Sequence, residues 1–174
     1  MLPDGALLEA REINCWRGDR HILRDVSFGV RAGEFLKLTG PNGVGKTTLI
    51  RIVCGLLPPE SGAVLWRGKQ VRSSNDDFHI EMAYLGHLNS LKADLTAREN
   101  LLCLAGLRQS LTEAEIDAAL DRVGILSRGD LVARSLSAGQ KRRLALARLL
   151  LSGATLWILD EPVTNLDTAG IELV

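Results

Sequence analysis

A glycine-rich loop that ends in a lysine and a threonine constrains this chain more than any other segment. It fits the pattern G-x-x-x-x-G-K-[ST], and its residues are Gly40, Pro41, Asn42, Gly43, Val44, Gly45, Lys46 and Thr47. In such loops the glycines let consecutive backbone N–H groups converge on phosphate oxygens, and the following helix adds its positive N-terminal end. The pattern therefore predicts that these residues, together with Thr48, bind the phosphates of a nucleotide.

The sequence on either side of the loop supports this interpretation. Residues 35–39 are predicted to form a short strand that enters the loop, and residues 48–54 have the apolar pattern of a packed helix. Within the loop, Lys46 would reach the β- and γ-phosphates, and Thr47 would ligate Mg²⁺. The alternative is a glycine-rich turn in an α/β domain that binds no nucleotide.

Length, charge and cysteine content narrow the possible classes of protein. A chain of 174 residues can bury one core, or form one domain that carries a smaller subdomain. Lys plus Arg and Asp plus Glu both number 21, so net charge gives no argument for nucleic-acid binding, and no nucleic-acid partner is expected. Cys15, Cys54 and Cys103 match no zinc or haem-attachment spacing and are expected to be small buried thiols in a reducing compartment. Because no signal region and no stretch of about 18 apolar residues occurs, we expect a soluble, cytoplasmic chain.

The predicted elements change from strands to helices near residue 88. Before this point, apolar alternation or short apolar runs predict three strands, at residues 26–30, 63–66 and 82–85. After it, two capping boxes, Thr96–Glu99 and Thr112–Glu115, predict helices, the second with residues 116, 120 and 123 on one face. We therefore expect the whole chain to be a single domain, with a core at about 1–87 and 141–174 and an inserted helical subdomain at about 88–140.

A second candidate site lies at a predicted helix start. Ser137 and Gln140 have the spacing of a capping box around Ala138 and Gly139, and a basic run follows. Locally this is an ordinary helix cap with a solvated first turn. The free N–H groups and positive dipole of a helix start can also bind an anion. The position of this helix, just before a strand that ends in two acids, favours the anion-binding interpretation.

The two acids follow the apolar strand predicted at 156–159. That strand delivers Asp160 and Glu161 to its C-terminal end, where ligands bind in open α/β sheets. Adjacent carboxylates point to different sides and can therefore divide the chemistry. Asp160 would hold Mg²⁺, and Glu161 would act as the general base that polarises an attacking water. A solvated turn is the alternative for an acidic pair after a strand, but the phosphate loop upstream favours a functional pair.

Together these segments resemble the nucleotide-binding domain of an ATP-binding cassette (ABC) protein over nearly the whole chain. The matching motifs are the Walker A loop at 40–47, the signature at 136–140 with Ala138 where glycine is usual, the Walker B strand ending at Asp160, the catalytic Glu161 and the D-loop at 164–167. The resemblance implies an α/β fold of the P-loop NTPase type, with a mixed β core and antiparallel N-terminal strands. It implies ATP and Mg²⁺ as cofactors. It also implies a head-to-tail dimer in which Ser137, Gly139 and Gln140 of one copy close over ATP held by the other copy.

The chain departs from the family pattern at three places. His87 stands where a glutamine usually contacts Mg²⁺ and links to the membrane partner, and an imidazole offers a different geometry from an amide. Arg17 takes the usual place of the aromatic residue that stacks on adenine, whereas Trp16 lies one residue earlier and can stack on adenine or pack elsewhere. The chain ends before the further strand and switch histidine of a complete cassette, so we expect a truncated C-terminus and poor turnover. His21 and His79 precede Walker B, cannot replace that histidine and are expected at the surface.

Within the family, the chain is most similar to the ATP-binding subunit of the bacterial cytochrome c maturation system, the haem exporter. The similarity lies in residues 84–87, 95–101, 136–143 and 154–162. It implies a peripheral ATPase on the cytoplasmic side of the bacterial inner membrane, with a membrane-spanning transporter subunit and a second copy of the cassette as partners. Other classes remain open: an ABC transporter ATPase for another substrate, a non-transport ABC ATPase, or a nucleotide-binding fragment with little turnover.

Overall fold

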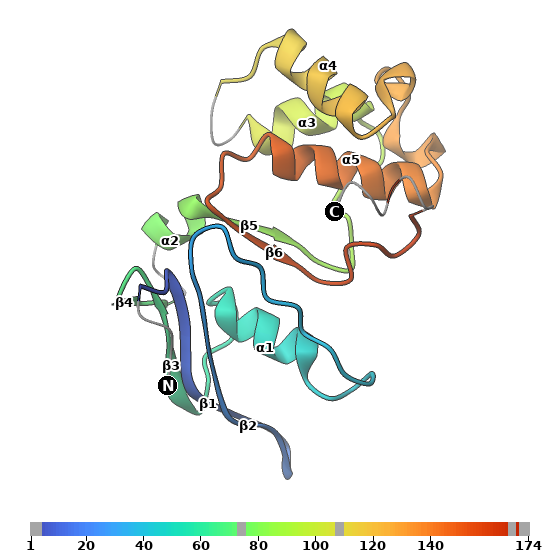
Figure 1. Ribbon diagram of the computed structural model, residues 1–174. Coiled ribbons are helices and arrows are strands. Elements are labelled where there is room, and N and C mark those ends of the chain that lie inside the picture. Colours follow the sequence, from blue (N-terminus) through green and yellow to red (C-terminus); the bar gives the residue numbers. More distant parts are fainter. Residues whose placement is uncertain (1–4, 73–75, 107–109, 167–169, 171–174) are drawn as a thin grey trace. The chain divides into compact units, whose positions relative to one another are not determined.

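The structure of the chain is a computed structural model that describes residues 5–72, 76–106, 110–166 and 170. The chain forms two compact units, Met1–His79 and Ile80–Val174, and each has buried hydrophobic residues of its own (Figure 1). The division expected from the sequence, a core with a helical subdomain inserted at about 88–140, stays a prediction.

The first unit contains a four-stranded antiparallel sheet with the strand order β2-β1-β3-β4. Its strands are β1 Leu8–Arg17, β2 Arg20–Val30, β3 Ser61–Trp66 and β4 Lys69–Gln70. The strands predicted at 26–30 and 63–66 lie within β2 and β3 and are confirmed. The antiparallel N-terminal strands expected of the fold are therefore present.

A bulge in β1 keeps its apolar side chains on one face of the sheet. Leu8 and Ala10 are buried, and after an irregularity in the pairing with β2 the buried positions continue at Ile13 and Cys15. Strict alternation would have buried Glu12 instead. Glu12 has a left-handed backbone, with φ of 51°, as expected where a bulge inserts an extra residue into a strand. The bulge thus lets an irregular apolar spacing serve a single buried face.

Helix α1, Lys46–Val53, follows the glycine-rich loop. Its buried residues are Leu49, Ile50, Ile52 and Val53. The helix predicted at 48–54 is confirmed, with its first residue at Lys46. Helix α2, Asp76–Glu81, buries Phe78, whose ring centroid lies 6.0 Å from that of Trp66 in β3. The first unit ends at His79, so Phe78 packs within it while the last two residues of α2 belong to the second unit.

The strand predicted at 35–39 is not formed. Residues 34–41 have no regular secondary structure, and the side chain of Phe35 is 90% exposed. A strand requires a neighbour that takes up its N–H and C=O groups. In the described part of the first unit, the sheet joins only β2, β1, β3 and β4, and residues 35–39 take no part in it. The prediction was wrong because apolar composition indicates burial but does not supply a pairing partner.

The second unit combines a two-stranded parallel sheet with helices. Strands β5 Met82–Leu85 and β6 Leu156–Leu159 match the two strands predicted there, and they pair from Met82 with Leu156 to Leu85 with Leu159. The helices between them are α3 Ala97–Ala105, α4 Glu113–Arg122 and α5 Ala138–Leu150, with 3-10 turns at Leu126–Arg128 and Ala133–Ser135. Figure 1 shows α3, α4 and α5 together on one side of the strand pair, and α5 contacts β5 and both other helices.

The core of this unit lies where the three helices meet. Leu101 of α3, Leu120 of α4 and Leu144 of α5 are almost fully buried in one cluster. The helical face predicted at residues 116, 120 and 123 is buried and is confirmed. Over the described residues, none of the helices combines the length and apolar character that crossing a membrane requires.

Capping boxes begin α3 and α4 as predicted. The Thr96 hydroxyl accepts a hydrogen bond from the Glu99 N–H at 3.1 Å, and the Glu99 carboxylate accepts one from the Thr96 N–H at 2.7 Å. The same pair of bonds joins Thr112 and Glu115. The pKa of Glu115 lies below its usual value because the backbone N–H of Thr112, and then its hydroxyl, donate to the carboxylate. Both helix starts are therefore fixed by local sequence.

Removing the α3 cap should cost stability without touching either candidate site. Thr96→Ala leaves the Glu99 N–H without its acceptor and should lower the free energy of unfolding by about 1 kcal/mol. Thr96→Ser keeps the hydroxyl and is the matched control, expected to stay within a few tenths of a kcal/mol of the parent. Urea denaturation followed by far-ultraviolet circular dichroism measures both. An alanine variant as stable as the serine variant would show that the cap contributes nothing.

Candidate functional site

The glycine-rich loop of the first unit has the backbone geometry that its sequence predicts. Gly40, Gly43 and Gly45 have φ angles of 147°, 81° and 110°, in a range that other residues rarely adopt. Gly45 is also the residue before α1, and a Cβ there would lie 2.5 Å from the Ile22 Cγ2 atom of β2. Glycine at this position therefore lets α1 start close to the sheet, with its first N–H groups open toward the loop.

Lys46 folds back over this loop. Its Nζ atom donates hydrogen bonds to the carbonyl oxygens of Gly40 at 2.8 Å and Pro41 at 3.0 Å. Thr47 is exposed, Thr48 is half-buried, and no acidic residue stands in the first turn of α1. A helix start without a side-chain cap, an ammonium group and the absence of an acidic residue in that turn favour anion binding, and phosphate binding here stays a prediction. The predicted ligands from Gly40 to Val44 are all exposed beside it.

Trp16 lies near the end of β1 with half of its surface exposed. Its ring stacks on the His21 imidazole, with the centroids 4.3 Å apart and the planes 2° from parallel. His21, expected at the surface, is half-buried: its ring lies against the half-exposed Trp16, and its Nε2 atom lies 2.9 Å from Asn14 Oδ1. His79 is also half-buried, with its Nε2 atom 3.2 Å from the Cys54 carbonyl oxygen. Stacking of Trp16 on adenine stays a prediction.

The signature segment begins α5 with the predicted capping box. The Ser137 hydroxyl accepts from the Gln140 N–H at 3.2 Å, and the Gln140 side chain accepts from the Ser137 N–H at 2.9 Å. A Cβ on Gly139 would lie 2.9 Å from the carbonyl oxygen of Asn165, so the segment after β6 passes directly over the helix start. Only glycine leaves room for this approach. Asp167 of the predicted D-loop lies outside the described residues.

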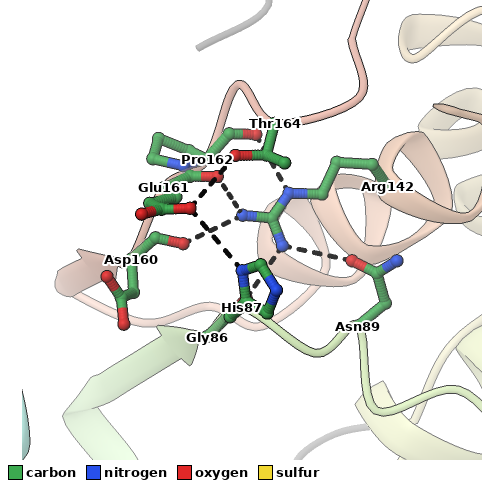
Figure 2. A network of polar contacts seen from close by, with 8 residues as sticks. All are labelled: Gly86, His87, Asn89, Arg142, Asp160, Glu161, Pro162 and Thr164. Carbon is green, nitrogen blue, oxygen red and sulfur yellow. Dashed lines mark hydrogen bonds and ion pairs between the residues drawn. The ribbon is translucent and has the colours of Figure 1, made fainter. Parts of the chain in front are cut away.

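The acidic pair stands at the end of β6. The Asp160 N–H donates to the Leu85 carbonyl at 2.8 Å, which extends the pairing of β5 with β6 and leaves Asp160 only 7% exposed. Among the described residues, none donates a hydrogen bond to the Asp160 carboxylate. The Glu161 side chain is 51% exposed, and its Oε2 atom lies 3.6 Å from His87 Nδ1 and 3.4 Å from the Thr164 hydroxyl. Figure 2 shows the Asp160 carboxylate pointing away from that group, so the two acids face different surroundings.

Arg142 is the residue at this site that sequence reasoning missed. It stands in the basic run after the helix start and was assigned no role from the sequence, yet it is only 2% exposed and bonds to the segments around Glu161 and His87 (Figure 2). A signal was available in the helical period. The buried residues Ala145, Leu146 and Leu149 place position 142 on the same apolar face of α5.

Comparison with known proteins identifies the family. The sequence pattern of the family described as ABC transporter matches residues 23–164. The chain belongs to the ABC transporter family. Two curated relatives of this family member carry the name "Cytochrome c biogenesis ATP-binding export protein CcmA". The one from Dechloromonas aromatica is 47% identical over 95% of this chain and 82% of its own length, and the one from Nitrosomonas europaea is 46% identical over 97% and 79%.

Solved structures agree with this placement in the ABC family. A putative ABC transporter ATP-binding protein from Pyrococcus furiosus superposes with a TM-score of 0.85 at 26% identity, covering 95% of this chain and 82% of its own. The structure of another ABC transporter ATP-binding subunit superposes with a TM-score of 0.83 at 30% sequence identity. The match covers 96% of this chain and 71% of that one. The predicted α/β fold of the ABC type is therefore confirmed, and the chain is an ATP-binding ATPase subunit whose hydrolysis is coupled to transport.

Proposed function

We propose that this ABC ATPase powers an export step in cytochrome c biogenesis, and that haem is the exported species. The observation that carries this proposal is the 47% identity, over 95% of the chain, to a relative whose name states that role. A separate membrane-spanning subunit would handle the cargo, and this chain would supply the free energy of ATP hydrolysis from the cytoplasmic side of the bacterial inner membrane.

Each of the predicted site residues has a proposed role of its own. Lys46 and the N–H groups that begin α1 would hold the β- and γ-phosphates. Thr47 offers a hydroxyl and Asp160 a carboxylate. Both are hard oxygen ligands of the kind that Mg²⁺ prefers, so each is proposed as a Mg²⁺ ligand. When bound, Mg²⁺ would neutralise charge on the phosphates. Glu161, half-exposed at the end of β6, would accept the proton of the attacking water.

His87 is proposed to assist Glu161. Its Nδ1 atom is 3.6 Å from Glu161 Oε2, which makes an ion pair when the imidazole is protonated. The contact would orient the carboxylate toward the water. A second copy of the chain would complete each site, with Ser137, Gly139 and Gln140 closing over the nucleotide. The chain has one copy of each motif, so two chains would make two such composite sites.

Genetic complementation tests the proposed cargo. Deleting this gene from its native bacterium should abolish the haem staining of c-type cytochromes in membranes. The parent chain should restore the staining, whereas Glu161→Gln should not. Glu113→Gln, which removes an exposed carboxylate from the first turn of α4, is the matched control and should restore it. Normal c-type cytochromes in the deletion strain would contradict the cargo and leave the ATPase assignment intact.

A further inference from the structure

The Arg142 side chain uses its whole hydrogen-bonding capacity inside the second unit. A guanidinium group has five N–H bonds, and each of them finds an oxygen acceptor in this unit. The acceptors, at 2.7–3.1 Å, are the main-chain oxygens of Gly86, Asp160, Glu161 and Pro162 and the side-chain oxygen of Asn89 (Figure 2). This arrangement is built for a guanidinium and matches no other side chain.

The acceptors belong to two segments that are far apart in the sequence. Gly86 and Asn89 lie in the turn after β5, the turn that also carries His87. The other acceptors form the turn after β6, which carries the acidic pair. Because β5 and β6 are parallel neighbours, both turns leave the sheet at the same edge. Arg142 reaches this edge from α5 and joins the two turns to each other.

Burial makes the contacts of this guanidinium costly to lose. Arg142 is 2% exposed, and burial lowers its pKa from the usual value, while the nearby Asp160 and Glu161 carboxylates act in the opposite direction. The side chain stays charged. A buried charge requires all of its hydrogen-bond partners. The position of the two turns is therefore coupled to that of Arg142.

The Glu161 backbone is strained, and the hydrogen bonds of this arrangement hold it in place. Glu161 has a left-handed backbone, with φ of 51°, which is a costly conformation for a residue other than glycine. Its carbonyl oxygen accepts from Arg142 at 2.7 Å and from the Thr164 N–H at 3.2 Å. These bonds hold the strained peptide, and the peptide in turn fixes the direction in which the Glu161 carboxylate leaves the main chain.

We propose that Arg142 is a positioning residue for ATP hydrolysis: it holds the Glu161 peptide and ties it to the turn that carries His87. Arg142 does not touch the reacting atoms in this role and acts through Glu161. The proposal rests on the proposed role of Glu161 as general base, and it is independent of the cargo. Any displacement of the turn after β5 is transmitted through the guanidinium to Glu161.

The central test is Arg142→Lys, measured as kcat of the purified protein and as ATP affinity. Lysine keeps the charge but has three donors for five acceptors. Loss of alignment should lower kcat about 10- to 100-fold, while the dissociation constant of ATP changes less than about threefold. Arg143→Lys is the matched control, since Arg143 is the neighbouring arginine of α5 and donates to the Val123 carbonyl, which lies outside both turns. It should retain the parent kcat.

A double-mutant cycle separates positioning from general structural support. If Arg142 acts through Glu161, then Arg142→Lys should add no further loss of kcat to Glu161→Gln. If the double variant lost kcat by the product of the two single losses, the proposal would be overturned. A folded Arg142→Lys variant with the parent kcat would overturn it as well. Full activity of Glu161→Gln alone would instead refute the general-base role on which the proposal depends, which distinguishes the two failures.

A milder variant keeps the test decisive if Arg142→Lys does not fold. Asn89→Ala removes one of the guanidinium's acceptors and leaves Arg142 in place. It should lower kcat by about threefold to tenfold, again with unchanged ATP affinity and no added effect in the Glu161→Gln background. Two results would show that the link to the turn after β5 does not serve Glu161. One is a parent-like kcat in folded Asn89→Ala, and the other is a double variant with Glu161→Gln whose loss of kcat is the product of the two single losses.

Discussion

Replacing Glu161 with Gln is expected to lower kcat for ATP hydrolysis by about 100- to 1,000-fold, with ATP affinity retained. The amide has nearly the shape of the carboxylate but cannot accept the proton of the attacking water. Binding survives because the phosphate loop lies in the other unit, from Gly40 to Thr47. Steady-state phosphate release and equilibrium binding of ATP measure the two quantities separately.

The surroundings of Glu161 indicate that Glu161→Gln removes the carboxylate without disturbing the structure around it. Arg142 and Thr164 bind the main-chain oxygen of Glu161, which the substitution leaves unchanged. The side chain is 51% exposed, so no buried cavity or buried unpaired group results. The control for the loss of one charge is Glu113→Gln, which removes an exposed carboxylate from the same unit and should keep the parent kcat. Hydrolysis by Glu161→Gln at the parent rate would mean that another group is the base.

The parts of the fold that could be predicted are those specified by neighbouring residues. A capping box needs only positions three apart, so the starts of α3, α4 and α5 were found correctly at Thr96, Thr112 and Ser137. The glycine loop is equally local, because a positive φ at Gly43 or Gly45 is a property of the residue itself. Short apolar runs between turn residues gave β5 and β6 at their observed limits.

Sequence reasoning missed contacts that only the fold brings about. His21 stacks on Trp16 across a hairpin, and His79 contacts a carbonyl 25 positions earlier, so neither partner could be inferred from local polarity. The run at 35–39 has three apolar residues in five, but strand pairing depends on which strands lie beside it. Arg142 was not singled out from the sequence, and charged residues are seldom buried. Its five acceptors lie 18 to 56 positions away, and only the fold brings them together.

Replacing Lys46 with Ala is expected to weaken ATP binding by about 10- to 150-fold, the range for losing a charge-assisted hydrogen bond. The ammonium group is a point charge over the loop, where it already contacts the carbonyl oxygens of Gly40 and Pro41. The glycines and the α1 helix start remain, so weak phosphate binding should persist. Isothermal titration with ATP and Mg²⁺ measures the change. Lys37→Ala, which removes an exposed ammonium from the same unit, is the control and should bind ATP like the parent.

The choice of nucleotide shows whether Lys46 acts on the β- and γ-phosphates or on the fold of the loop. A lysine that reaches those two phosphates gains little from a ligand that lacks both. Lys46→Ala should therefore weaken ATP and ADP binding strongly and leave the weaker binding of AMP within about twofold of the parent. If instead the loss were equal for all three nucleotides, Lys46 would act by holding the loop closed through Gly40 and Pro41. Unchanged affinity for ATP would contradict the assignment of Lys46 to the β- and γ-phosphates, because no other side chain of residues 40–47 carries a positive charge that could replace it.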